Sequence, residues 1–136
     1  MFVDSSAFVA ILTREPDCDF YRNVLAQAKT AFTSPLVKLE TAIVVSKFYR
    51  GSVEQSRDAL EQLIKVTSIK IIDLDNQIGE ISIDAYARFG KGQNNSAKLN
   101  IADCMHYAVA KKFGVPILCK GSDFSETDLK VLRSPD

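Results

Sequence analysis

The sequence predicts an α/β fold in which a short central parallel sheet is covered by helices on both faces. Short apolar segments alternate with longer segments whose apolar residues recur at helical spacing. The strand-like segments are almost continuously apolar, as expected for strands that are buried on both faces. A length of 136 residues suits one compact domain and is too short for two. We therefore expect a three-layer α/β/α domain spanning residues 1–136.

The N-terminal segment predicts the first strand and the first helix. An apolar run ends at Asp4, and Ser5 or Ser6 can cap a helix that ends before Arg14. Further helices are expected over 17–29, 36–49, 53–66, 77–89 and 101–113, and further strands over 30–33, 69–74 and 115–120.

Three details of this assignment are specific enough to test. The helix over 36–49 is expected to turn one apolar stripe inward, formed by Leu39, Ile43, Val44 and Phe48. Gly90 is expected to cap the end of the helix over 77–89. The segments 90–97 and 121–127 are expected to be polar loops, the second followed by a short tail.

Composition excludes several classes of protein. The 17 basic and 17 acidic residues cancel, whereas a protein that coats nucleic acid usually carries a basic excess. The three cysteines form no CxxC pair, which argues against a zinc ribbon or a disulfide framework and fits a reducing cytoplasm. The N-terminus lacks a basic leader, and no apolar run reaches the roughly 20 residues that cross a bilayer. We expect a cytoplasmic protein without a membrane partner.

Four acids differ from ordinary surface charge because each stands at the start or end of a predicted element. Asp4 and Asp123 follow predicted strands, and Glu40 and Asp103 lie in the first turns of apolar helices. Each has an ordinary structural explanation, as a helix cap, a favourable charge at a helix N-terminus, or a turn residue. Together they are expected at one edge of a parallel sheet, where functional groups gather.

Carboxylates crowded at one edge repel each other unless they are protonated or neutralised by a cation. Ligation by oxygen alone suits Mg²⁺ or Mn²⁺ rather than zinc. Such an ion activates water and stabilises charge on a phosphoryl group. We therefore interpret Asp4, Glu40, Asp103 and Asp123 as candidate metal ligands and catalytic residues, with the Ser6 hydroxyl in support.

At these residues the sequence resembles the PIN-domain family, and within it the VapC-type toxins of type II toxin–antitoxin modules. The resemblance covers nearly the whole chain through FVDSSAFVAIL, SPLVKLETAIV and YARFGKGQNNSAKLNIADCMHYAVAKKFGVPILCKGSDFSETDL. It implies a PIN-like fold, Mg²⁺- or Mn²⁺-dependent endoribonuclease activity and hydrolysis of RNA. Asp4 and Asp103 match the principal ligands, Glu40 and Asp123 the other acids, and Ser6 the supporting hydroxyl. The resemblance also implies a VapB-type antitoxin that occupies the active site, and a homodimer.

The chain departs from the subgroup pattern at two places, and neither touches a proposed ligand. Where the pattern has His-Pro-Ala after FGKG, this chain has residues 94–97 as Asn-Asn-Ser-Ala. Where the pattern has Gly before the helix aspartate, this chain has Ala102. The first departure bears on substrate contacts in that loop.

Several other polar residues lie close in sequence to the proposed site. Basic residues that can contact RNA are Arg14, Lys38, Lys91, Lys98 and Lys120, although solvated surface charge is the more ordinary interpretation of each. The single histidine, His106, falls three residues after Asp103 on nearly the same helix face. A place in the core or at its rim is favoured for it over a supporting role at the metal.

Alternative functions remain open from the sequence. A haloacid-dehalogenase-type phosphotransfer domain needs Asp-x-Asp after the first strand, and this chain has Asp4-Ser5-Ser6. A receiver domain needs a pair of acids that is missing. A housekeeping RNA-processing PIN nuclease without an antitoxin, or a PIN-like module that binds RNA or protein without cleavage, is compatible with the same residues.

Overall fold

The sheet of the computed structural model, which describes residues 1–135, is entirely parallel with strand order β3-β2-β1-β4-β5. Phe2 of the central strand pairs with Phe32 on one side and with Ile117 on the other. Each strand is two residues long: β1 (Phe2–Val3), β2 (Phe32–Thr33), β3 (Lys70–Ile71), β4 (Ile117–Leu118) and β5 (Val131–Leu132).

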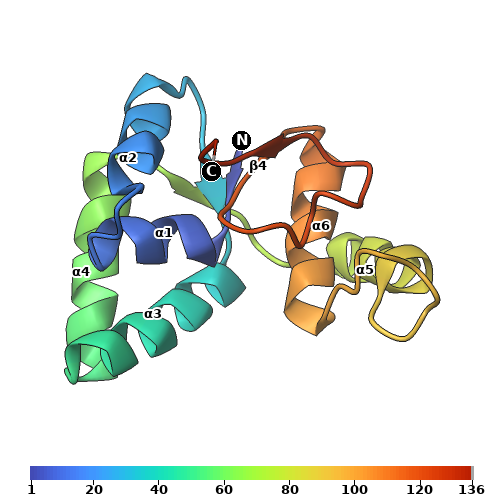
Figure 1. Cartoon of the computed structure of the whole chain (residues 1–136), viewed down its shortest axis with the longest axis horizontal. Helices are drawn as coiled ribbons and strands as arrows, with labels where there is room; N and C mark the ends of the chain where they lie inside the picture. Colours follow the sequence, from blue (N-terminus) through green and yellow to red (C-terminus); the bar gives the residue numbers. More distant parts are fainter. Residues whose placement is uncertain (136) are drawn as a thin grey trace.

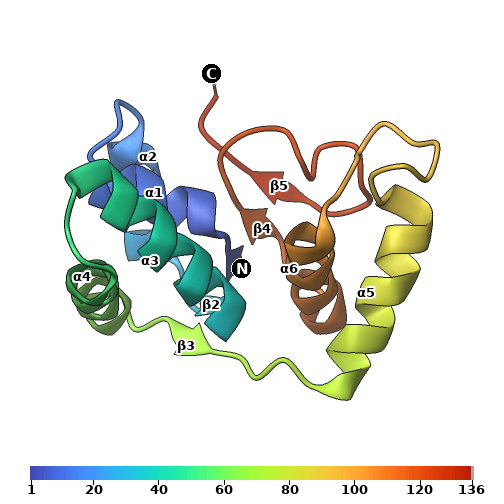
Figure 2. The same ribbon diagram turned by 90° about the horizontal axis from the view of Figure 1, so that it is seen from below.

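Helices flank this sheet on both sides, which confirms the predicted three-layer arrangement. Helices α1 to α4 lie on one side and α5 and α6 on the other (Figures 1 and 2). The helices are α1 (Ser5–Leu12), α2 (Cys18–Gln27), α3 (Pro35–Tyr49), α4 (Val53–Val66), α5 (Asn76–Phe89) and α6 (Ile101–Phe113). No helix among residues 1–135 is both long enough and apolar enough to cross a membrane.

The helices begin where capping side chains satisfy free backbone N–H groups. The Ser34 hydroxyl accepts a hydrogen bond from the Val37 backbone N–H in α3. Pro35 occupies the first turn of this helix. Ser52 and Asn100 start α4 and α6 as reciprocal capping boxes, and the Asp75 carboxylate caps α5. Helix α2 is the exception, because Asp17 makes no capping bond with its side chain. The predicted bounds of the helices over 17–29, 36–49, 53–66, 77–89 and 101–113 agree with the structure within two residues.

The predicted inner face of α3 is wrong. The four residues of that stripe are all exposed, Leu39 at 55% and Phe48 at 62%, together with Ile43 and Val44. The buried face instead carries Val37, Thr41 and Val45, at a spacing of four residues. Apolar residues surround α3, so periodicity could not decide which face meets α1 and α4, the two helices it contacts most.

Two further features differ from expectation. The tail forms β5, which pairs with β4 and was not predicted because its two apolar residues stand alone between Lys130 and Arg133. Gly90 does cap α5, but its backbone is extended, with φ −67°, rather than left-handed. Glycine is needed there because a Cβ atom would lie 2.5 Å from the Tyr86 carbonyl oxygen.

Asp128 ties the C-terminal segment to α5 and α6. Its carboxylate accepts hydrogen bonds from the buried Tyr107 hydroxyl at 2.6 Å and from the Lys111 ammonium at 2.8 Å, and Arg88 lies 3.7 Å away. Burial opposes ionisation, but the bonds from Lys111 and Tyr107 outweigh it and hold the pKa of Asp128 below its ordinary 3.8.

We expect Asp128→Asn to lower the free energy of unfolding at neutral pH by about 1 kcal/mol, the usual net value of such bonds. A lowered carboxyl pKa stabilises the folded state above the unfolded pKa, and that contribution is lost as pH falls through the folded pKa. The difference between parent and variant in urea unfolding should therefore shrink below pH 3.8. Asp84→Asn, at an exposed position of α5, is the control. A difference that stayed constant to low pH would contradict the assignment.

Candidate functional site

The candidate site lies where the sheet changes direction. The chain runs from β1 outward to β3 and then returns to the other side of β1 with β4, so β1 and β4 are neighbours at the switch point. In parallel α/β sheets, ligands bind beyond the carboxyl ends of the strands at this point. Asp4 directly follows β1, and the segment from Lys120 to Asp123 follows β4.

Asp4 is buried and caps α1. Its carboxylate accepts hydrogen bonds from the Ser6 backbone N–H at 3.1 Å and from the Ser6 hydroxyl at 2.6 Å. The Ser6 oxygen in turn accepts the Lys120 backbone N–H at 2.8 Å. Ser6 thus forms a chain of hydrogen bonds that joins the ends of β1 and β4.

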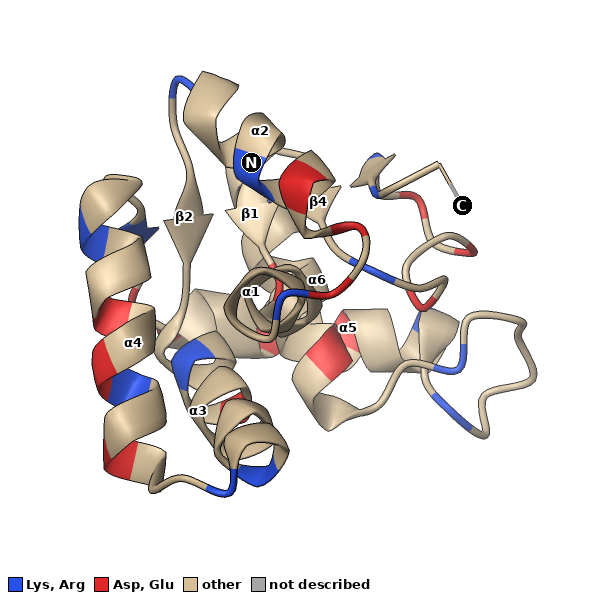
Figure 3. Ribbon diagram, turned by 60° about the vertical axis from the view of Figure 1, so that its left-hand side comes forward, with Lys and Arg blue, Asp and Glu red and all other residues tan. Residues whose placement is uncertain are grey.

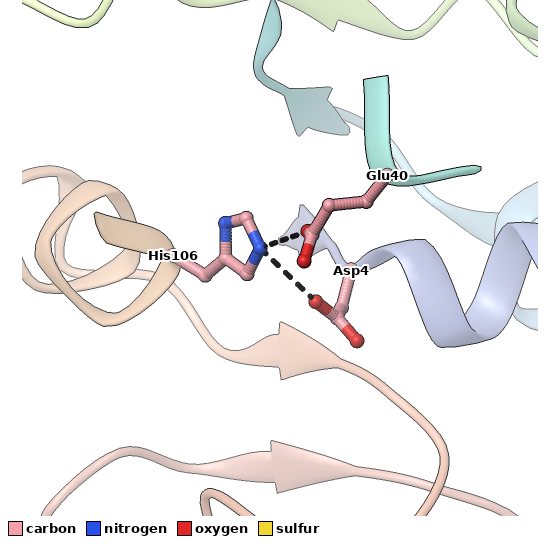
Figure 4. A group of neighbouring side chains, drawn as sticks. All are labelled: Asp4, Glu40 and His106. Carbon is pink, nitrogen blue, oxygen red and sulfur yellow. Dashed lines mark hydrogen bonds and ion pairs between the residues drawn. The ribbon is translucent and has the colours of Figure 1, made fainter. Parts of the chain in front are cut away.

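Glu40 and His106 reach Asp4 from opposite layers. Glu40 comes from α3 and His106 from α6, and both side chains point toward Asp4 (Figure 4). The His106 Nε2 atom lies 2.5 Å from Glu40 Oε1 and 3.8 Å from Asp4 Oδ1. One ligand atom of each residue lies within 4.8 Å of the others, a grouping that can hold a metal ion.

His106 lies beside the acids, a position that the sequence analysis did not favour. The side chain is only 1% exposed, as expected for a core histidine, yet its Nε2 atom faces two carboxylates. Burial lowers the pKa of His106, but the hydrogen bond to Glu40 and the charges of Asp4 and Glu40 outweigh it and raise that pKa. Its spacing of three residues from Asp103 was the available signal.

Asp103 and Asp123 complete the negative surroundings. Asp103 lies in the first turn of α6, where its carboxylate accepts the Asn100 backbone N–H at 3.1 Å. Burial, followed by the negative charges of Asp123 and Asp4, raises the pKa of Asp103 to about 6. Asp123 is exposed in the loop after β4.

The structure therefore divides the four acids predicted from the sequence into two pairs. Asp4 and Glu40 are brought together around His106, whereas Asp103 and Asp123 act on the same region through their charge. Neighbouring carboxylate oxygens suit a divalent cation, because the cation removes the repulsion between them. The residues present thus fit Mg²⁺ or Mn²⁺.

The five basic residues divide into two groups. Lys38 forms an ion pair with Glu61, and Lys120 pairs with Glu15 and Asp17 in the connection between α1 and α2. The remaining three are exposed, namely Arg14, Lys91 and Lys98. Acidic and basic positions are interspersed along α4 (Figure 3).

Fold and site define an α/β protein with acids converging at the carboxyl edge of a parallel sheet. The family model of the PIN domain matches residues 1–130, and the chain belongs to that family. A VapC ribonuclease of Rhizobium meliloti is 34% identical over 94% of this chain and 98% of its own length. A ribonuclease VapC of Mycolicibacterium smegmatis is 36% identical over 98% of this chain and its whole length.

Solved structures agree on the fold. VapC20 of Mycobacterium tuberculosis, a sarcin-ricin loop cleaving toxin, superposes with a TM-score of 0.78 at 18% identity and covers 98% of both chains. VapBC2 of Rickettsia felis, bound to a DNA fragment from its promoter, gives a TM-score of 0.68 at 19% identity over 97% of this chain and 96% of the other.

We expect Ser6→Ala to destabilise the protein by about 1–3 kcal/mol, because it leaves the Lys120 N–H without its acceptor and Asp4 with one donor, the backbone N–H of residue 6, instead of two. The free energy of unfolding in urea measures the loss. Ser5→Ala is the matched control, since the Ser5 hydroxyl makes no hydrogen bond among the described residues and alanine suits a helix. Equal stability of the two variants would show that the Ser6 bonds carry little weight.

Proposed function

We propose that the protein is a metal-dependent endoribonuclease and the toxin of a VapBC-type toxin–antitoxin pair. The observation that carries the proposal is the convergence of Asp4 and Glu40 at the switch point, with Asp103 and Asp123 adding charge. Membership of the PIN family and the likeness to VapC ribonucleases over nearly the full chain support ribonuclease chemistry in particular.

In this proposal Asp4, Glu40, Asp103 and Asp123 hold Mg²⁺ or Mn²⁺. The ion supplies Lewis-acid stabilisation of phosphoryl charge and lowers the pKa of a bound water. Glu40 is the acid placed to orient the attacking water and accept its proton, because its side chain is 32% exposed while that of Asp4 is 11% exposed. Ser6 fixes the orientation of Asp4 during the reaction.

The RNA backbone requires positive charge near the acids. Arg14, Lys91 and Lys98 have exposed side chains and are the stronger candidates for phosphate contacts. Lys38 and Lys120 are already paired with carboxylates and would first have to give up those partners. The loop that carries Lys91 is ordered by Asn95, whose side chain bonds the Gly90 carbonyl and the Ala97 N–H.

An antitoxin protein and a second copy of the chain are the proposed protein partners. The structural neighbours include a toxin–antitoxin complex from Klebsiella pneumoniae and VapBC from Salmonella typhimurium bound to DNA. Exposed large apolar side chains on α3, such as Leu39 and Phe48, support contact with protein. The three cysteines are free, which supports a cytoplasmic location.

We expect Asp4→Asn and Asp103→Asn to reduce RNA cleavage by more than about 100-fold, beyond the loss typical of residues that only support a ligand. Cleavage of a mixed RNA pool is measured with Mn²⁺, with Mg²⁺ and with EDTA, and EDTA should abolish it. Asp58→Asn, an exposed acid on α4, should retain full activity. Cleavage that persists equally in EDTA, or in both site variants, would refute the metal-nuclease proposal.

We expect the isolated chain to have twice its monomer mass of 15.0 kDa in light scattering. When it is expressed together with a small adjacent reading frame, we expect the product of that frame to co-purify with it. A partner of this kind should also inhibit cleavage. A monomeric, fully active protein with no such neighbouring gene would favour a housekeeping nuclease. In that case the toxin assignment fails while the nuclease assignment stands.

A further inference from the structure

We propose that His106 is a direct nitrogen ligand of the divalent ion, and that Asp4, Glu40 and His106 form a mixed carboxylate–imidazole site that prefers Mn²⁺ over Mg²⁺. This inference rests on the proposed metal-dependent function. It adds a nitrogen donor to a site that the sequence predicts to be made of carboxylates alone.

The first support is the position of three donor atoms from three separate elements. Asp4 follows β1, Glu40 lies on α3 and His106 lies on α6, yet their ligand atoms fall within 4.8 Å of one another. Metal–ligand bonds of about 2.1 Å separate two donors by about 3 Å at a right angle and about 4.2 Å on opposite sides. The observed Nε2 separations of 2.5 and 3.8 Å reach this range with small side-chain adjustments.

The second support is the burial of the imidazole. His106 is 1% exposed and packs beside Phe2, with ring centroids 5.8 Å apart, so the ring is held in place with Nε2 toward the acids. A fixed ring with its nitrogen inside a carboxylate cluster is arranged in advance for a cation, which favours affinity.

The third support is the other ring nitrogen. Nδ1 is buried and has no hydrogen-bond partner among the described residues. A donor at Nδ1 would force the proton of a neutral ring onto Nε2 and block ligation. In the metal-free state Nε2 donates its proton to Glu40, so a divalent ion has to displace that proton before Nε2 can bind it. No donor among the described residues holds Nδ1 as an acceptor, so the ring can keep its remaining proton on Nδ1 once the metal has replaced the proton on Nε2.

The donor set determines the preferred ion. Imidazole nitrogen suits first-row transition ions, whereas Mg²⁺ strongly prefers oxygen and keeps much of its water. Two carboxylates with one imidazole therefore favour Mn²⁺ over Mg²⁺. A site built from the four acids alone has no such reason to discriminate.

A spectroscopic test is sharp because His106 is the only histidine in the chain. Mn²⁺ is added to the metal-free full chain, purified without a histidine tag, and electron spin-echo envelope modulation is recorded. We expect imidazole ¹⁴N modulation on bound Mn²⁺, replaced by a ¹⁵N pattern when only histidine is labelled. Modulation without that isotope response would arise from another nitrogen and would overturn the inference.

Affinity gives a second measurement. In calorimetric titrations, His106→Gln should weaken Mn²⁺ binding by about tenfold or more and Mg²⁺ binding much less. Glutamine keeps a side-chain amide able to bond Glu40 but removes the imidazole nitrogen, and circular dichroism verifies that the variant is folded. Should this variant fail to fold, the isotope experiment on the parent protein still decides.

The outcomes separate this inference from the proposed function. If Mn²⁺ binds and RNA is cleaved without ¹⁴N modulation, His106 only positions Glu40, and the inference fails while the nuclease proposal stands. If neither Mn²⁺ binding nor metal-dependent cleavage occurs, both fail. Equal losses of Mn²⁺ and Mg²⁺ affinity in His106→Gln would overturn the claimed preference.

Discussion

The buried carboxylate of Asp4 is the constraint on which the site depends. A charge at the end of the central strand is costly to bury unless hydrogen bonds or opposite charge compensate it. The structure supplies two donors from Ser6, and Ser6 in turn accepts the backbone N–H of Lys120. The same bonds that satisfy Asp4 thus hold the ends of β1 and β4 together. The position of Asp4 therefore depends on the pairing of β1 with β4.

The remaining acids create a second problem, because neighbouring carboxylates repel each other when both are ionised. Asp103, near 6, is the clearest case: burial contributes most and the charges of Asp123 and Asp4 add to it. His106 is the one side chain among these residues able to carry positive charge, and it lies against Glu40 and Asp4. The metal-free site therefore contains its own partial compensation, which a divalent cation would replace with a stronger one.

Sequence reasoning succeeded where the signal was local. Cap residues such as Ser52 and Asn100 act within one turn, so helix starts could be predicted without tertiary information. The parallel sheet also followed from the alternation of strands and helices, although its strand order did not. The pairing of His106 with Glu40 joins residues 66 positions apart, which no local spacing reveals. Likewise the inward face of α3 depends on which helices it meets, and its own apolar pattern does not specify them.

The balance of charge in this chain has a consequence for RNA recognition. Two of the five bases expected near the site, Lys38 and Lys120, are engaged by carboxylates, which removes them from the count of free positive groups. Affinity for a nucleic-acid backbone rises with the number of phosphates neutralised, so under the proposed function Arg14, Lys91 and Lys98 are the candidates among these five that are free to neutralise phosphates. The salt dependence of RNA binding would then reflect these three side chains more than Lys38 or Lys120.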